Sequence, residues 1–147
     1  MAAYRKILVA YNGAPESRAA VEEAARIGAE PGVEVHVGAV LNTAAYLVAG
    51  EYVPEMTLAA GRDELEADLK EVERNLVARG LQVHSHLVVG EPVDVISRLV
   101  ESLGVDLLIL GHARAKSFAL RWWRGSVDTL LIERVRCSIL IAADVKA

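Results

Sequence analysis

Cysteine and proline are scarce in this chain, and so are large aromatic residues. Its 147 residues include one cysteine, four prolines, one phenylalanine and two tryptophans. With Cys137 alone, the chain can form no internal disulfide, no cysteine-based metal centre and no redox pair. We interpret Cys137 as a small apolar residue at the start of a buried segment rather than as a nucleophile. These absences favour a reducing compartment, and we expect the cytoplasm.

An excess of positive charge is also missing, and so is a long apolar run. Sixteen basic and twenty acidic residues give a net charge of −4, which argues against general binding to nucleic acid or to anionic membranes. The first apolar run, ILVAY, is too short for a signal-peptide core or a membrane span. We therefore expect a soluble protein that meets any anion through a local basic patch.

Apolar runs and helical spacings alternate along the chain. Buried strands are predicted at residues 7–11, 33–41, 81–89, 105–110 and 137–142. The segments between them predict four helices, and the last of these is expected to present an apolar face of Val127, Leu130, Leu131 and Val135. This alternation predicts a doubly wound α/β fold, in which helices cover both faces of a parallel sheet. No repeat, low-complexity tract or linker divides the sequence, so we expect one domain over residues 1–147.

In such a sheet, ligands bind beyond the carboxyl ends of the strands, where the strand order reverses. This rule predicts that Asn12, Val40, Gly90 and Gly111 lie on one rim, because each stands at or near the end of a predicted strand. The longest connection, residues 42–54, leaves from the same rim and is a candidate cover.

The segment from Val105 to Ala142 gives the strongest indication of function. The apolar strand VDLLIL leads into Gly111, a basic loop follows, and Gly125-Ser126 opens a helix. A glycine lets the backbone approach an anion, and a helix start directs unpaired amide hydrogens and the positive end of the helix dipole at one point. The segment therefore predicts a phosphate site.

The loop between these glycines carries four basic side chains, at Arg114, Lys116, Arg121 and Arg124. They are interpreted either as a clamp on phosphate or as charges on a solvated loop. The two tryptophans of the chain, Trp122 and Trp123, lie in the same loop. They either contact a ligand or partner, or fill space against the last helix.

Histidines give a weaker signal. His84 and His86 are two residues apart on a predicted strand, so they share a face, and such a pair is able to bind a metal. Because no third ligand is near in sequence, we expect no metal site. We expect His36 to be a hydrogen-bonded histidine within the sheet. His112 directly follows Gly111, and a phosphate contact by its ring is left open.

The segments KILVAYNG, GEPVDVI, LILG, GSV and CSILIA together resemble the universal stress protein family, over nearly the whole chain. The resemblance implies five parallel strands in the order 3-2-1-4-5, the adenine nucleotide alpha hydrolase-like fold. It also implies a small cytoplasmic stress-response protein that forms a homodimer through its last strand. With that order the strand carrying His84 and His86 lies at an edge, where polar residues are ordinary.

One branch of this family binds ATP through a motif of Gly, two residues, Gly, nine residues, Gly and then Ser or Thr. Here Gly111 matches the first glycine and Gly125-Ser126 matches the last pair, but Arg114 replaces the middle glycine and ten residues follow it. Asn12 stands where the family has an aspartate that contacts adenine. Asp128 replaces a serine that often follows the terminal pair, and its carboxylate would repel a terminal phosphate.

The resemblance implies ATP, ADP or AMP as the ligand, with the involvement of Mg²⁺ left open, and Asp128 favours a mono- or diphosphate. The expected contact residues are Asn12, Val40, Gly90, Gly111, Arg114, Gly125, Ser126 and Val127. The sequence contains no Ser/His/Asp arrangement in a recognisable elbow and no complete Walker loop. We therefore expect a regulatory binding module, at most a weak ATPase. The alternative is an interaction protein that binds no nucleotide and acts through its dimer surface or through Trp122-Trp123.

Overall fold

The computed structural model describes residues 2–42, 55–112 and 130–143 of the chain. The strands are β1 (Lys6–Tyr11), β2 (Glu34–Leu41), β3 (Gln82–Val89), β4 (Leu107–His112) and β5 (Ser138–Ala143). The helices are α1 (Pro15–Gly28), α2 (Glu55–Ala78) and α3 (Pro92–Leu103), and residues 130–134 are also helical. Among these described residues, no helix is long and apolar enough to cross a membrane.

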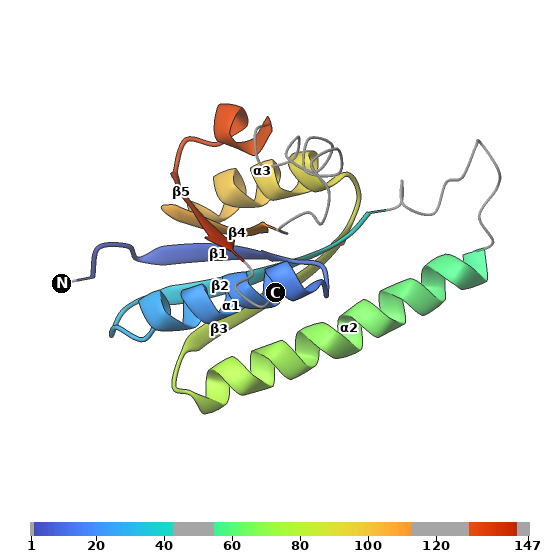
Figure 1. Cartoon of the computed structure of the whole chain (residues 1–147), viewed down its shortest axis with the longest axis horizontal. Coiled ribbons are helices and arrows are strands. Elements are labelled where there is room, and N and C mark those ends of the chain that lie inside the picture. The colour runs from blue at the N-terminus through green and yellow to red at the C-terminus, as the bar shows by residue number, and fades with distance from the viewer. Residues whose placement is uncertain (1, 43–54, 113–129, 144–147) are drawn as a thin grey trace.

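The five strands form one parallel sheet in the order β3-β2-β1-β4-β5 (Figure 1). β1 is the central strand, where Val9 is level with Val37 of β2 on one side and with Ile109 of β4 on the other. The strand order predicted from the family resemblance is therefore confirmed. From β1 the chain builds the sheet outward first in one direction and then in the other, so the order reverses at this strand.

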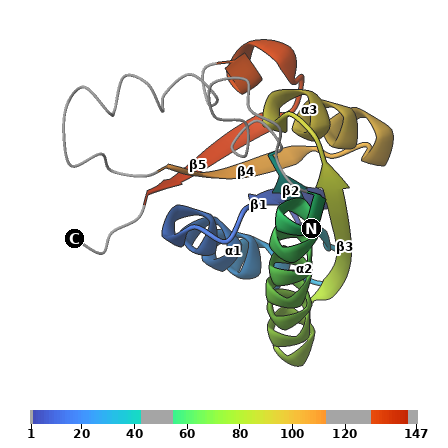
Figure 2. The ribbon, with the colours of Figure 1, turned by 90° about the vertical axis from the view of Figure 1, so that its right-hand side faces the viewer.

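Helices cover both faces of the sheet, as predicted (Figure 2). α1 and α2 pack on one face, where Ala24, Leu69 and Leu76 join Val9 and Val37 in a buried cluster. α3 packs on the other face together with Leu131, and its buried residues meet alternate residues of the same strands. Because both faces are covered, the inner strands are apolar at nearly every position, which is the pattern that identified them in the sequence.

α3 shows how local sequence sets the ends of a helix. The carboxylate of Glu91 accepts the backbone N–H groups of Val93 and Asp94 at 3.1 and 2.9 Å, which satisfies two of the unpaired donors of the first turn. Pro92 occupies the first helical position, where no N–H is needed. Gly104 ends the helix with a φ of 68°. The turn and helix start predicted at residues 90–92 are confirmed.

Two expectations about the C-terminal third of the chain were wrong. β4 continues through His112, two residues beyond the predicted end, because Gly111 and His112 pair with Ala142 and Ala143 of β5. Gly111 is thus a strand residue rather than the first residue of a loop. In the last helix, Leu131 is fully buried but Leu130 is 46% exposed. Neighbouring residues point about 100° apart around a helix, and here the sheet covers the side that carries Leu131.

Candidate functional site

The carboxyl ends of the parallel strands bring several predicted site residues to one edge of the sheet. Asn12 directly follows β1, Gly90 directly follows β3, and Val40 is the penultimate residue of β2. Gly111 is the penultimate residue of β4. Since the strand order reverses at β1, Asn12 and Gly111 border the position where open α/β sheets bind ligands. The other expected contact residues, Arg114, Gly125, Ser126 and Val127, lie outside the described residues, as do Trp122, Trp123 and Asp128.

Asn12 begins a tight turn between β1 and α1. Its side-chain oxygen Oδ1 accepts the backbone N–H of Ala14 at 2.9 Å, which is an Asx turn. The hydroxyl of Ser17 donates to the carbonyl of Ala14 at 2.7 Å and closes the other side of the turn. Gly13 between them has a φ of 86°, a conformation that favours glycine. The Asn12 side chain is thus exposed but held in a fixed orientation.

Gly111 has a packing reason that is independent of any ligand. A Cβ atom at this position would overlap the carbonyl group of Glu16 and lie 2.8 Å from the backbone nitrogen of Ser17. These atoms belong to the first turn of α1, so β4 and α1 approach each other backbone to backbone. A glycine in a strand often marks such an approach. Gly90 is similar but milder, because its Cβ would lie 2.9 Å from the Val95 side chain.

Val40 is a core residue. Its side chain is 7% exposed and belongs to the cluster beneath α3 that includes Leu8 and Val93. Any contact between this residue and a ligand at the rim would therefore involve mainly its backbone.

Comparison with known proteins places this architecture. The model of the universal stress protein family matches residues 3–143. The chain belongs to the universal stress protein family.

Individual relatives agree with this assignment. The universal stress protein YxiE of Bacillus subtilis is 29% identical over 147 residues, which cover 94% of this chain and 98% of that protein. Two solved structures share the fold. One is a universal stress protein in complex with cAMP, with 23% identity, a TM-score of 0.71 and coverage of 97% and 99% of the two chains. The other is a universal stress protein family protein of Arabidopsis thaliana with AMP bound, with 15% identity, a TM-score of 0.66 and coverage of 95% and 91%.

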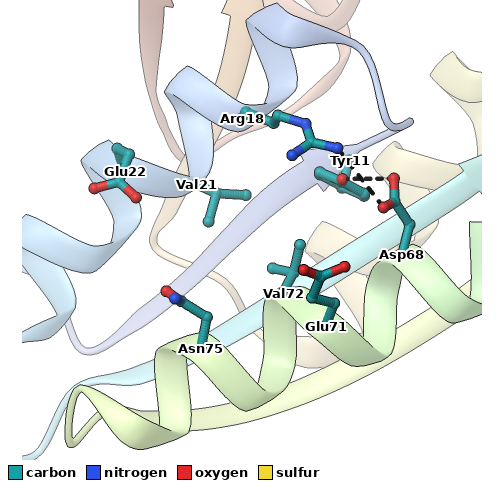
Figure 3. Close-up of a pocket in the computed structure, with 8 residues that line it drawn as sticks. All are labelled: Tyr11, Arg18, Val21, Glu22, Asp68, Glu71, Val72 and Asn75. Atoms are coloured by element: carbon teal, nitrogen blue, oxygen red, sulfur yellow. Dashed lines mark hydrogen bonds and ion pairs between the residues drawn. The ribbon is translucent and has the colours of Figure 1, made fainter.

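This universal stress protein also has a cavity of about 270 Å³ between α1 and α2 that the sequence analysis did not predict (Figure 3). It is lined by Tyr11, Arg18, Val21, Glu22, Asp68, Glu71, Val72 and Asn75. Only the pairing of two helices about fifty residues apart creates it, and no local motif announces such a pairing. The helical stripe that includes Leu69 and Val72 was the one signal, and it identified the core side of α2 rather than the cavity.

The polar groups of this cavity are paired with one another. The Tyr11 hydroxyl donates to Asp68 at 2.9 Å, and an Arg18 nitrogen lies 3.7 Å from the same carboxylate. Burial, and then the hydrogen bond to Asp68, raise the pKa of Tyr11 to about 12, so the phenol stays protonated at neutral pH. Asp68 also lies under the Asn12 turn, since its carboxylate would be 3.3 Å from a Cβ on Gly13. The pair therefore links α2 to the turn that carries Asn12.

Three histidines meet on the opposite face of the sheet, at its β2–β3 edge. Nδ1 of His36 lies 3.0 Å from Nε2 of His86, and the His36 ring stacks on the His84 and His86 rings at centroid distances of 4.9 and 5.2 Å. Burial, followed by the neighbouring imidazoles, lowers the pKa of His36, and burial followed by His84 lowers the pKa of His86.

The expectation that His36 is fully hydrogen-bonded was wrong. Its Nε2 is buried, and no described residue pairs with it. The third histidine that the sequence lacked near His84 and His86 comes from the adjacent strand, at a register that places His36 beside His84. Even so, no group of three histidine, cysteine or acidic residues within the described ranges is arranged to hold a metal ion.

Cys137 is half-buried, and burial raises the pKa of its thiol. A raised pKa keeps the thiol protonated and unreactive, which agrees with the interpretation of Cys137 as an apolar filler.

Proposed function

We propose that this universal stress protein is a regulatory, stress-response binding module that takes an adenine nucleotide or a related phosphate ligand at the carboxyl edge of its sheet. The observation that carries the proposal is the position of Asn12 and Gly111 on either side of the reversal of strand order. Two proteins of the same fold are described with cAMP and with AMP bound, which supports an adenine nucleotide as the ligand class.

Each predicted contact residue has a role in this proposal. Asn12 meets the base, and the backbone near Val40 and Gly90 lines the space beside it. The amides of Gly111, Gly125, Ser126 and Val127 face phosphate, and Arg114 adds a charged fork where the family motif has a glycine. The Asp128 carboxylate opposes a third phosphate, so a mono- or diphosphate binds better than ATP unless Mg²⁺ bridges the two groups.

Isothermal titration of nucleotide-stripped protein with ATP, ADP and AMP, each with and without Mg²⁺, tests this proposal. We expect micromolar binding, with AMP or ADP tighter than ATP in the absence of Mg²⁺. Arg114→Ala is expected to weaken binding by about tenfold or more, the usual loss for one charge-assisted hydrogen bond. Arg98→Ala is the matched control, because it removes an equal charge from an exposed position of α3. Flat titrations with all three nucleotides would contradict the proposal.

The alternative is an interaction protein that uses its dimer surface or the Trp122-Trp123 loop. One observation favours it. Three of the large apolar side chains that are exposed among the described residues fall in the segment 130–143, namely Leu130, Ile132 and Ile141. Under this alternative, nucleotides have no effect and Trp122→Ala abolishes capture of a protein partner. A cytoplasmic location fits either function, because the single cysteine suits a reducing compartment.

We further propose a homodimer in which β5 pairs with β5 of a second copy. In the described sheet, β5 is hydrogen-bonded to β4 on one side only, and such an open edge invites pairing. Sedimentation velocity at micromolar concentration is expected to show a dimer. Ile141→Lys, at a position that is 42% exposed on β5, is expected to shift it to monomer. Val77→Lys, on a 53% exposed residue of α2, is the control and should leave the dimer intact. A stable wild-type monomer would contradict this part of the proposal.

A further inference from the structure

The hydrogen bond already made by Asn12 decides what its side chain can offer a base. One lone pair of Oδ1 is taken by the N–H of Ala14 at 2.9 Å, and this bond fixes the plane of the amide. Within the described part of the chain, Nδ2 donates to no residue, although Asn12 is exposed at the rim. The two hydrogens of Nδ2 are therefore the groups that face a ligand.

We infer that Asn12 selects nucleotides whose purine base carries a 6-oxo group, as in hypoxanthine and guanine. The inference rests on the proposed function, since it needs a nucleotide at this rim. A 6-oxo purine presents two acceptors side by side, N7 and O6, whereas adenine presents the N7 acceptor beside an N6 donor. An asparagine with both ends available pairs with adenine through its oxygen and its nitrogen. Asn12 has its oxygen engaged, so it matches two acceptors and opposes the adenine amino group with a second donor.

The turn that carries Asn12 is rigid enough to enforce this selection. Ser17 closes the turn from α1, with its hydroxyl 2.7 Å from the carbonyl of Ala14. From below, Tyr11 and Asp68 brace it through a 2.9 Å hydrogen bond between β1 and α2. To offer its oxygen fully to adenine, the amide would have to rotate and leave the N–H of Ala14 unpaired, at the cost of one hydrogen bond. A side chain held by its surroundings discriminates better than one that can adapt.

The test is isothermal titration of wild-type protein and of Asn12→Asp with AMP and with IMP. The two nucleotides share ribose and phosphate and differ at base position 6 and in the proton on N1. Wild type is expected to bind IMP about three- to tenfold more tightly than AMP, the range for one hydrogen bond gained or lost. In Asn12→Asp, one carboxylate oxygen keeps the bond to Ala14 and the other is an acceptor, so the preference is expected to reverse in favour of AMP.

The readout is the ratio of the two affinities within each variant, which cancels the repulsion between the new carboxylate and the phosphate. Urea unfolding of Asn12→Asp checks that the turn is intact. Equal affinities for AMP and IMP, tighter binding of AMP by wild type, or an unchanged ratio in Asn12→Asp would each overturn the inference and leave the proposed function standing. Failure of wild type to bind either nucleotide would overturn the proposed function, and the inference with it.

Discussion

Gly111→Ala is expected to lower the free energy of unfolding by about 3 kcal/mol or more, the upper end for overpacking a well-filled interior. The added methyl would overlap the carbonyl group of Glu16 and crowd the nitrogen of Ser17. Both neighbours are backbone atoms, so no side-chain rotation relieves the contact. Either the first turn of α1 moves away from β4, or β4 shifts in its pairing with β5. Each movement breaks packing around the central strands.

Urea unfolding followed by circular dichroism measures this change. Gly38→Ala is the matched control, since Gly38 lies in the middle of β2 but its Cβ would meet only the ends of the Leu8 and Leu99 side chains, at 3.2 and 3.1 Å. Those side chains can adjust, and alanine also restricts the unfolded chain, so the control is expected to change stability by no more than about 1 kcal/mol. Equal effects of the two substitutions would show that α1 does not approach β4 as closely as the structure has it.

This prediction changes how the glycine-rich motif is understood. In the sequence, Gly111 marks the start of a loop that gives amides to phosphate. In the structure, it is a paired strand residue that lets α1 approach the sheet next to the Asn12 turn. The two roles are compatible, because the close approach also places the turn beside the end of β4. Loss of nucleotide binding in a Gly111 variant would therefore not by itself show that Gly111 contacts the nucleotide.

Local sequence patterns predicted most of the fold. The apolar runs of β1 and β2 and the Gly-Glu-Pro turn before α3 each report a single local environment, namely burial on both faces or a helix start. The strand order needed the family resemblance, because no local pattern says which strands are neighbours. The end of β4 was missed for a related reason, since Gly111 and His112 become strand residues only through β5.

The candidate site was predictable only as a set of positions. The topological rule identified the ends of the strands, and so it identified Asn12 and Gly111. It could not show that the Asn12 oxygen is taken by Ala14, or that Asp68 braces the turn from α2. Asp68 is 57 residues from its partner Tyr11, and in the sequence it resembles any polar residue beside a helical stripe. Contacts of this kind depend on how the elements pack, which sequence spacing does not encode.

The histidine cluster shows the same limit and leads to the second large effect. His36 and His86 are fifty residues apart, yet their ring nitrogens lie 3.0 Å from each other. If both rings were protonated, neither nitrogen would accept the hydrogen bond. Protonated His36 would also carry a buried N–H on Nε2, an atom for which no described residue is a partner. The nearby charges act in both directions, since Glu34 raises the pKa of His36 while Lys6 and the two other histidines lower it, and burial is the largest cause.

The free energy of unfolding is therefore expected to fall as the pH is lowered through the ordinary histidine range. His36 and His86 have lower pKa values in the folded protein than the unperturbed 6.5, so the unfolded chain binds more protons. Their contribution to stability is fully present above pH 6.5 and is lost as the pH falls toward their folded pKa values. Each histidine contributes a slope of at most about 1.4 kcal/mol per pH unit. Urea midpoints measured between about pH 8 and pH 5 follow this loss before most carboxylates titrate.

Two variants separate the histidines from other acid effects. The double variant His36→Leu/His86→Leu removes both groups with side chains suited to this face, and its urea midpoint is expected to stay nearly constant over the same pH range. His84→Leu is expected to keep most of the wild-type slope, because burial outweighs the charge of His84 as the cause of both lowered pKa values. A slope that survives in the double variant would place the titrating groups elsewhere. A slope lost in His84→Leu alone would make repulsion between the imidazoles, rather than burial, the dominant effect.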